Sequence, residues 1–136
     1  MLKTKKIYIT IIILSLIASG CASYKPGLSS MWGADYNELS KVKRDGVTKE
    51  INMPIDKTFD EVLKIAGENK LTVFKKDSKK KFLILIGFPK QTNTTRVGVF
   101  FEPINNSSTI ITLSSLSSAT LVKAKKIIFE NIKPEK

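Results

Sequence analysis

Phe82-Leu83-Ile84-Leu85-Ile86-Gly87-Phe88 is the stretch of sequence that decides the fold. It is apolar at consecutive positions, which is typical of a β-strand covered on both faces. Successive side chains of a strand point to opposite faces, so Leu83 and Leu85 share one face and Phe82 and Ile84 share the other. Either pair can face the helices. We take Leu83 and Leu85 as the open side, where contiguous apolar surface would mark an interface.

Shorter strand patterns flank this stretch on both sides. The turn residues 77–80 and 105–107 separate neighbouring strands, as expected for hairpins. An apolar helical face after Asp56, which we expect to be the N-cap, includes Phe59 and Val62. A second helix is expected over 118–132. The expected strands cover residues 47–53, 71–76, 81–88, 95–102 and 108–116.

This order predicts the α+β class. We expect a two-layer sandwich over residues 47–133, with an antiparallel sheet of about five strands and two helices on one face. The expected order is β-α-β-β-β-β-α.

The N-terminal residues read as an export signal. Three lysines near the start precede an apolar run at residues 7–17, which is shorter than a membrane-spanning helix needs. Small residues follow, ending at Cys21. Ala18-Ser19-Gly20-Cys21 resembles a lipobox, the motif read by lipoprotein signal peptidase. The resemblance implies removal of residues 1–20 and attachment of lipid, palmitate included, to Cys21. The alternative is an uncleaved anchor helix.

The rest of the pattern resembles a family of small, uncharacterised bacterial envelope lipoproteins. The resemblance rests on the helix entry at 54–59, the strand Leu71-Thr72-Val73, the paired hairpins and the closing helix through Ile132. It is similar, more distantly, to helix-grip modules in accessory lipoproteins of outer-membrane assembly. Ala22 after the cysteine implies the outer membrane, facing the periplasm, in a Gram-negative host. The family brings no catalytic residues.

Residues 21–46 are expected to carry the lipid and then form a tether. Trp32, Tyr36 and Leu39 recur at helical spacing within this segment. They indicate either a short helix docked on its own domain or a segment that binds a partner or a membrane surface. We therefore include Trp32 and Tyr36, with Leu83 and Leu85, among the candidate partner-binding residues.

The composition excludes several kinds of chemistry. The chain has no histidine and one cysteine, so zinc sites built on imidazole and thiolate, Ser-His-Asp catalysis and Cys-His catalysis are all excluded. We expect no enzyme, no cofactor and no metal. The net charge of +11 favours anionic partners. Nucleic acid is not expected, because no recognition motif is present and the chain is exported.

Five lysines crowd one expected hairpin: Lys75, Lys76, Lys79, Lys80 and Lys81. Such a run either solvates the turn and blocks edge-to-edge aggregation or binds an anionic lipid or polysaccharide. The sequence therefore supports two hypotheses for the function. The first is a membrane-anchored, non-enzymatic module that binds an envelope protein or a second copy of itself. The second is a receptor for an anionic envelope component.

Overall fold

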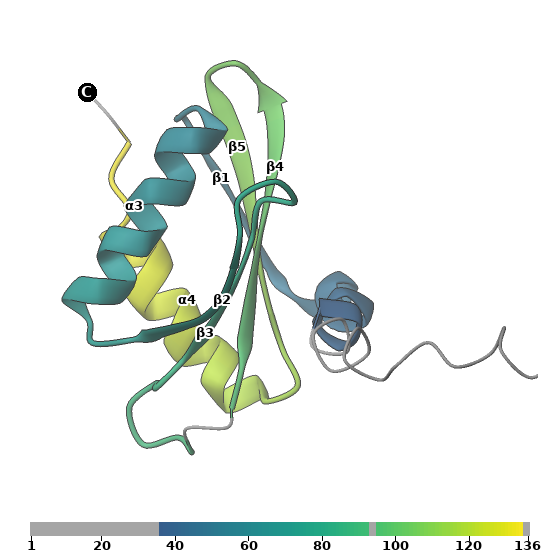
Figure 1. Ribbon diagram of the computed structural model, residues 1–136, viewed down its shortest axis with the longest axis vertical. Coiled ribbons are helices and arrows are strands. Elements are labelled where there is room, and N and C mark those ends of the chain that lie inside the picture. Colours follow the sequence, from purple (N-terminus) through teal and green to yellow (C-terminus); the bar gives the residue numbers. More distant parts are fainter. Residues whose placement is uncertain (1–35, 93–94, 135–136) are drawn as a thin grey trace, which may run out of the picture. The chain divides into compact units, whose positions relative to one another are not determined.

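The computed structural model describes residues 36–92 and 95–134, which belong to one compact unit, Asp35–Lys136 (Figure 1). Residues 36–41 form a helical segment that runs directly into the next element. The elements that follow are η1 (Val42–Asp45), β1 (Val47–Ile51), α3 (Ile55–Glu68), β2 (Thr72–Asp77), β3 (Phe82–Ile86), β4 (Val97–Asn105), β5 (Ser108–Ser115) and α4 (Ser118–Asn131).

The five strands form one antiparallel sheet in the order β1-β5-β4-β3-β2. The hairpins β2–β3 and β4–β5 arise because short turns join antiparallel neighbours. Helices α3 and α4 lie on one face of the sheet, as Figure 1 shows, while residues 36–45 lie on the opposite side. Strands β1 and β2 are the two edges, since each pairs with a single neighbour among the described residues.

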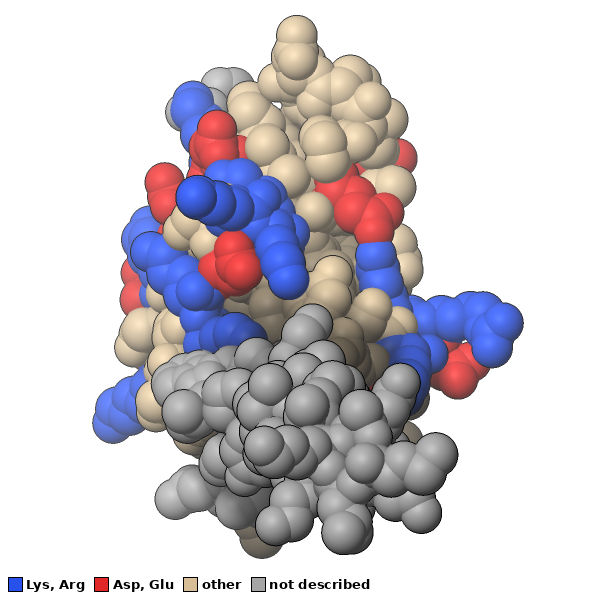
Figure 2. All heavy atoms as spheres, turned by 45° about the vertical axis from the view of Figure 1, so that its right-hand side comes forward, with Lys and Arg blue, Asp and Glu red and all other residues tan. Residues whose placement is uncertain are grey.

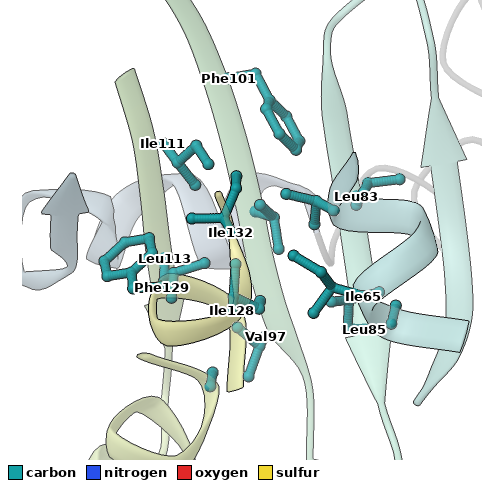
Figure 3. Close-up of a cluster of buried hydrophobic side chains, with 14 of the residues drawn as sticks. Ile65, Leu83, Leu85, Val97, Phe101, Ile111, Leu113, Ile128, Phe129 and Ile132 are labelled. Carbon is teal, nitrogen blue, oxygen red and sulfur yellow. The ribbon is translucent and has the colours of Figure 1, made fainter. Parts of the chain in front are cut away.

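The main core fills the space between the sheet and the two helices (Figure 3). Alternate residues of β4 and β5 point into it, while α3 and α4 contribute apolar residues at helical spacing. Fully or almost fully buried members include Leu83, Leu85, Val97, Val99, Ile111, Leu113, Val62, Ile65, Ala124 and Ile128.

The expected placement of Leu83 and Leu85 on an open face is wrong. Both side chains are 0% exposed and belong to the main core under the helices. The register explains the reversal, because Leu85 pairs with Val97 and Leu83 with Val99, whose side chains meet the helices. Directly paired residues share a face of the sheet. Leu83 and Leu85 therefore cannot form a partner-binding surface.

Phe88 also departs from the simple alternation. It lies in the main core, whereas Phe82 and Ile84 lie on the other face. Gly87 separates them with a φ of 89°, a left-handed conformation that glycine adopts without strain. The chain turns there, and Phe88 reaches the helix side.

The ends of the two long helices are fixed by local hydrogen bonds. Pro54 is the N-cap of α3, and the Thr58 hydroxyl donates to its carbonyl at 2.9 Å. The prediction that Asp56 is the N-cap is therefore wrong. Asp56 lies in the first turn of α3, where the helix dipole favours a carboxylate. At α4, the Ser117 hydroxyl accepts from the Thr120 N–H, as N-caps commonly do.

The α+β class and the five-stranded antiparallel sheet are confirmed, but the expected count of two helices is wrong. Besides α3 and α4, the described residues contain η1 and the helical segment 36–41 that leads into it. The compact unit also begins near residue 35 rather than 47. Residues 36–46 were assigned to the tether because they lie outside the regular strand and helix pattern that begins at Val47, although the helical spacing of Tyr36 and Leu39 already indicated a docked helix as one of two interpretations.

Candidate functional site

The sheet face opposite α3 and α4 carries its own apolar cluster. We call it the second-face cluster; its members are Leu39, Phe82, Ile84 and Phe100, with Tyr36 packed against them. The rings of Tyr36 and Phe82 meet edge to face, with centroids 4.9 Å apart. Aromatic pairs of this kind contribute about 0.5–1.5 kcal/mol beyond their buried area. The segment 36–41 is thus docked on its own sheet, the first of the two interpretations of its helical spacing.

Gly98 and Ser114 allow the helical segment 36–41 to pack closely against the sheet. A Cβ atom on Gly98 would lie 3.1 Å from the Leu39 Cβ and 3.0 Å from the Phe100 ring. A glycine within a strand often marks such an approach. Beside it, the buried Ser114 hydroxyl donates to the Leu39 carbonyl at 2.9 Å. Just beyond the segment, in η1, Lys43 forms an ion pair with Glu102.

Gly98→Val is expected to displace residues 36–41 while leaving the main core folded. The added methyl groups would overlap Leu39 and Phe100, and overpacking costs about 1–3 kcal/mol. We expect faster amide exchange over residues 36–45 and a free energy of unfolding lower by that amount. Gly67→Val is the control, because a Cβ there meets nothing within 4 Å. Unchanged exchange at 36–45 in Gly98→Val would contradict the docking.

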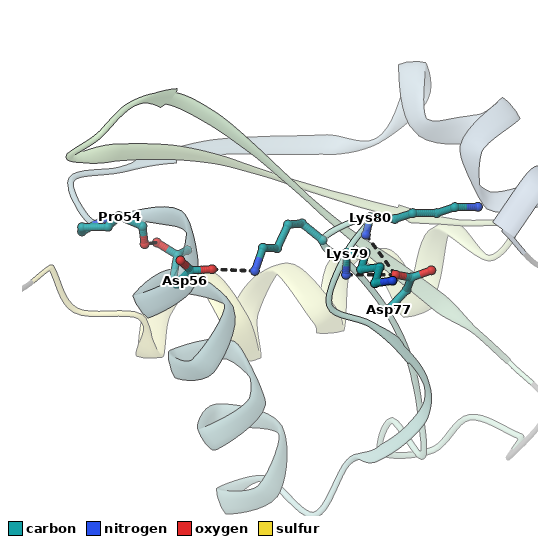
Figure 4. Close-up of polar contacts among 7 residues, drawn as sticks. Pro54, Asp56, Asp77, Lys79 and Lys80 are labelled. Atoms are coloured by element: carbon teal, nitrogen blue, oxygen red, sulfur yellow. Dashed lines mark hydrogen bonds and ion pairs between the residues drawn. The ribbon is translucent and has the colours of Figure 1, made fainter.

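The tip of the β2–β3 hairpin is organised by Asp77 (Figure 4). Its carboxylate accepts from the N–H of Lys80 at 2.9 Å and from that of Lys79 at 3.1 Å. These bonds, Lys80 first, together with the charges of Lys80 and Lys75, hold the pKa of Asp77 below its ordinary value. These hydrogen bonds therefore hold the backbone of Lys79 and Lys80 in a defined turn at the tip of the hairpin.

The five hairpin lysines do not form a single site. Lys76 and Lys81 lie over the Phe59 ring, with Nζ to centroid distances of 5.9 and 5.3 Å, and Lys81 is also paired with Asp56 (Figure 4). Lys80 lies on the other side, 4.8 Å from the Tyr36 ring centroid. Lys79 is exposed at the tip. Lys75 pairs across the hairpin with Ile84, on the second face.

Acidic side chains lie among the basic ones on this side of the molecule, as Figure 2 shows. Because the Asp56 side chain is 79% exposed, its ion pair with Lys81 contributes at most about 1 kcal/mol to stability. Lys79 and Lys80 are the hairpin lysines best placed to meet an anion, and Lys80 joins the hairpin to the second-face cluster.

Two of the predicted site residues, Cys21 and Trp32, lie outside the described residues. Of the others, the structure brings Tyr36 and Lys80 together and sends Leu83 and Leu85 into the core. Sequence reasoning did not find Gly98 and Ser114. A glycine inside an expected strand was the available signal for the first of them.

Within residues 36–92 and 95–134, no cluster of three histidine, cysteine or acidic side chains is arranged to hold a metal ion. No helix in that part of the chain is long and apolar enough to cross a membrane. A scan of protein-family models and a search of curated proteins give no significant match for this sequence.

Proposed function

We propose that this chain is a lipoprotein of the bacterial cell envelope, anchored by lipid on Cys21, whose folded unit is a non-enzymatic module that binds an envelope protein. Its proposed location in a Gram-negative host is the periplasmic side of the outer membrane. The proposal takes the unit as a two-layer sandwich in β-α-β-β-β-β-α order, with residues 36–45 as partial cover on the second face.

The docking of Tyr36 in the second-face cluster is the observation that carries this proposal. Fourteen residues, 22–35, then separate Cys21 from Tyr36, the first described residue of the folded unit. Fourteen residues span at most about 50 Å even when fully extended. An anchored unit would therefore work close to the bilayer surface, which suits a module whose partner is a membrane protein. The absence of histidine and of a second cysteine in the sequence supports a non-enzymatic role.

Crosslinking of the lipidated chain in its native envelope, followed by mass spectrometry, tests the binding function. We expect crosslinks from the folded unit to one membrane-associated protein, and their loss when the chain is displaced from the envelope. Recovery of only intramolecular links, under conditions where known envelope complexes are captured, would overturn it.

A second candidate function, binding of anionic lipid head groups, is favoured by the contact between Lys80 and Tyr36. Tyr36 is the first described residue of the folded unit, so Lys80 at the hairpin tip lies beside the point where the described part of this unit begins. A lipid anchor and a few basic residues together bind an anionic membrane more strongly than either does alone.

Amine labelling of the full lipidated chain in vesicles tests this second function. In phosphatidylglycerol-rich vesicles, acetylation of Lys79 and Lys80 should slow about fivefold relative to phosphatidylcholine, since each lysine near an anionic surface gains roughly 1 kcal/mol. Lys64 and Lys133, exposed elsewhere, are internal controls. High salt should remove the difference. Equal slowing at all four lysines would contradict a role for the hairpin.

A further inference from the structure

A groove runs between the edge strand β1 and helix α4, on the helix-covered side of the sheet. Its volume is about 570 Å³. The residues that line it are Val47, Thr48, Lys49, Val122, Lys125, Lys126, Phe129 and Glu130. None of the candidate site residues described above belongs to it.

One wall of the groove is an open strand edge. In the sheet of the described residues, β1 pairs with β5 alone, and its residues 48–50 are exposed. Strand edges of this kind accept an added strand through main-chain hydrogen bonds. The five residues of β1 offer about 17 Å of edge.

The other edge of the sheet is less suited to such pairing. The register of β2 shifts between Val73 and Lys75, which marks a bulge, and the exposed Phe74 ring lies 4.4 Å from the Arg96 guanidinium. Bulges and lysines are the usual means of blocking an edge. Strand β1, by contrast, has a continuous register with β5.

The opposite wall, α4, defines the chemistry of the occupant. Val122 is 67% exposed and offers an apolar contact. Lys125 and Lys126 are exposed, and within the described part of the chain neither has an ion-pair partner. Glu130 is the single acidic residue of the lining, so positive charge prevails.

Lys49 has a different role from the lysines of α4. Its Nζ donates to the Phe129 carbonyl at 2.8 Å and lies 5.8 Å from the Phe129 ring centroid. It therefore joins the C-terminal part of α4 to β1, within the lining of the groove.

We propose that β1 and α4 bind an extended, acidic segment of a partner protein, which adds to the sheet beside β1 with its acidic side chains near Lys125 and Lys126. This inference rests on the proposed binding function and names the surface and the chemistry of the partner. Main-chain bonds to β1 supply affinity, while Val122 and the two lysines supply selectivity.

Two of the registers in which a second copy of this chain could pair with β1 are unfavourable. In a continuous antiparallel sheet, a two-fold axis at Lys49 would set two lysines directly opposite each other. An axis at Glu50 would do the same for two glutamates. Like charges in directly opposed positions destabilise a strand pair. These two registers of self-pairing are therefore disfavoured, and the excess of lysine over glutamate in the groove favours a partner strand with acidic side chains.

Fluorescence anisotropy with the full chain in detergent tests the proposal. The probe is a fluorescein-labelled peptide of about eight residues in which glutamate and valine alternate; the same peptide with lysine for glutamate is its control. We expect the acidic peptide to bind at least about tenfold more tightly, a difference of roughly 1.4 kcal/mol. Amide chemical shifts should change in β1 and α4.

Two variants and one matched control locate the site. The double variant Lys125→Glu/Lys126→Glu should reverse the preference between the peptides, and Val122→Glu should weaken binding of the acidic one about tenfold. Leu116→Glu, at a residue 71% exposed outside the groove, should leave binding unchanged. The positions are exposed, so folding should survive, as an unchanged amide spectrum would verify.

The proposal is overturned if neither peptide binds at millimolar concentration, if shifts map to β2, or if anionic vesicles bind to this surface and the peptide does not. Binding in detergent does not depend on the anchor. Failure here would leave lipid labelling of Cys21 unaffected, and failure of that labelling would leave peptide binding unaffected.

Discussion

Leu83→Asp is expected to unfold the protein. The Leu83 side chain is 0% exposed and packs in the main core between the sheet and the helices. Truncating a buried leucine costs about 2–5 kcal/mol, and an unpaired buried carboxylate adds several more. A domain of this size has a free energy of unfolding of only about 5–15 kcal/mol. We expect the loss of the cooperative thermal transition measured by circular dichroism.

Leu116→Asp provides the matched control for this substitution. Leu116 is 71% exposed, so the same change should alter the free energy of unfolding by no more than about 0.5 kcal/mol. Leu83→Ala should lie between the two, folded but less stable by about 2–5 kcal/mol. If Leu83→Asp melts like the parent chain, the assignment of the two faces of β3 is wrong.

The reversal of faces at β3 shows which properties of a strand the sequence pattern can predict and which it cannot. Apolar residues at consecutive positions correctly indicate a strand covered on both sides. A period of two separates Leu83 from Phe82, but it does not say which of them meets the helices. Pairing with Val97 and Val99 decides that, and pairing is a property of the tertiary structure.

The strands and long helices were predictable because their signals are local. Alternation, turn residues and helical spacing lie within windows of about ten residues. Docking of residues 36–41 was one of two interpretations of their spacing, but the sequence could not choose between them, since the receiving surface depends on Gly98 and Ser114, more than fifty residues away. The helical spacing was visible, but the surface that receives the segment was not.

The lysine hairpin gives a similar lesson about the candidate site. A run of basic residues in the sequence suggests one anionic site. Strand alternation instead directs Lys76 toward Phe59 and Lys75 to the second face. The turn at Asp77 then separates both from Lys79 and Lys80. The count of charges was predictable, whereas their division between two faces required the register.

Cys21→Ser is expected to abolish attachment of lipid to the chain. A thiol at the first mature position receives the diacylglycerol, and the hydroxyl of serine does not replace it. No second cysteine exists in the sequence, so no other thiol can take its place. Two or three acyl chains hold a protein on a membrane essentially permanently, so their loss should change its attachment completely.

Membrane fractionation alone is an ambiguous readout for this variant. If the signal is not cleaved, the apolar run at residues 7–17 can retain the chain at the membrane without lipid. The size of the chain and its lipid content must therefore be read together. Ser23→Ala is the matched control, two residues beyond the cysteine, and should be lipidated and processed like the parent chain.

Metabolic labelling with an alkyne analogue of palmitate, in cells that express the parent chain, Cys21→Ser or Ser23→Ala, tests the anchor most directly. The account predicts strong labelling of the parent chain and of Ser23→Ala and none of Cys21→Ser, which should also migrate at the size of the unprocessed chain. Labelling of Cys21→Ser at the level of the parent, or no labelling of the parent, would contradict the proposal that this protein is a lipoprotein anchored through Cys21.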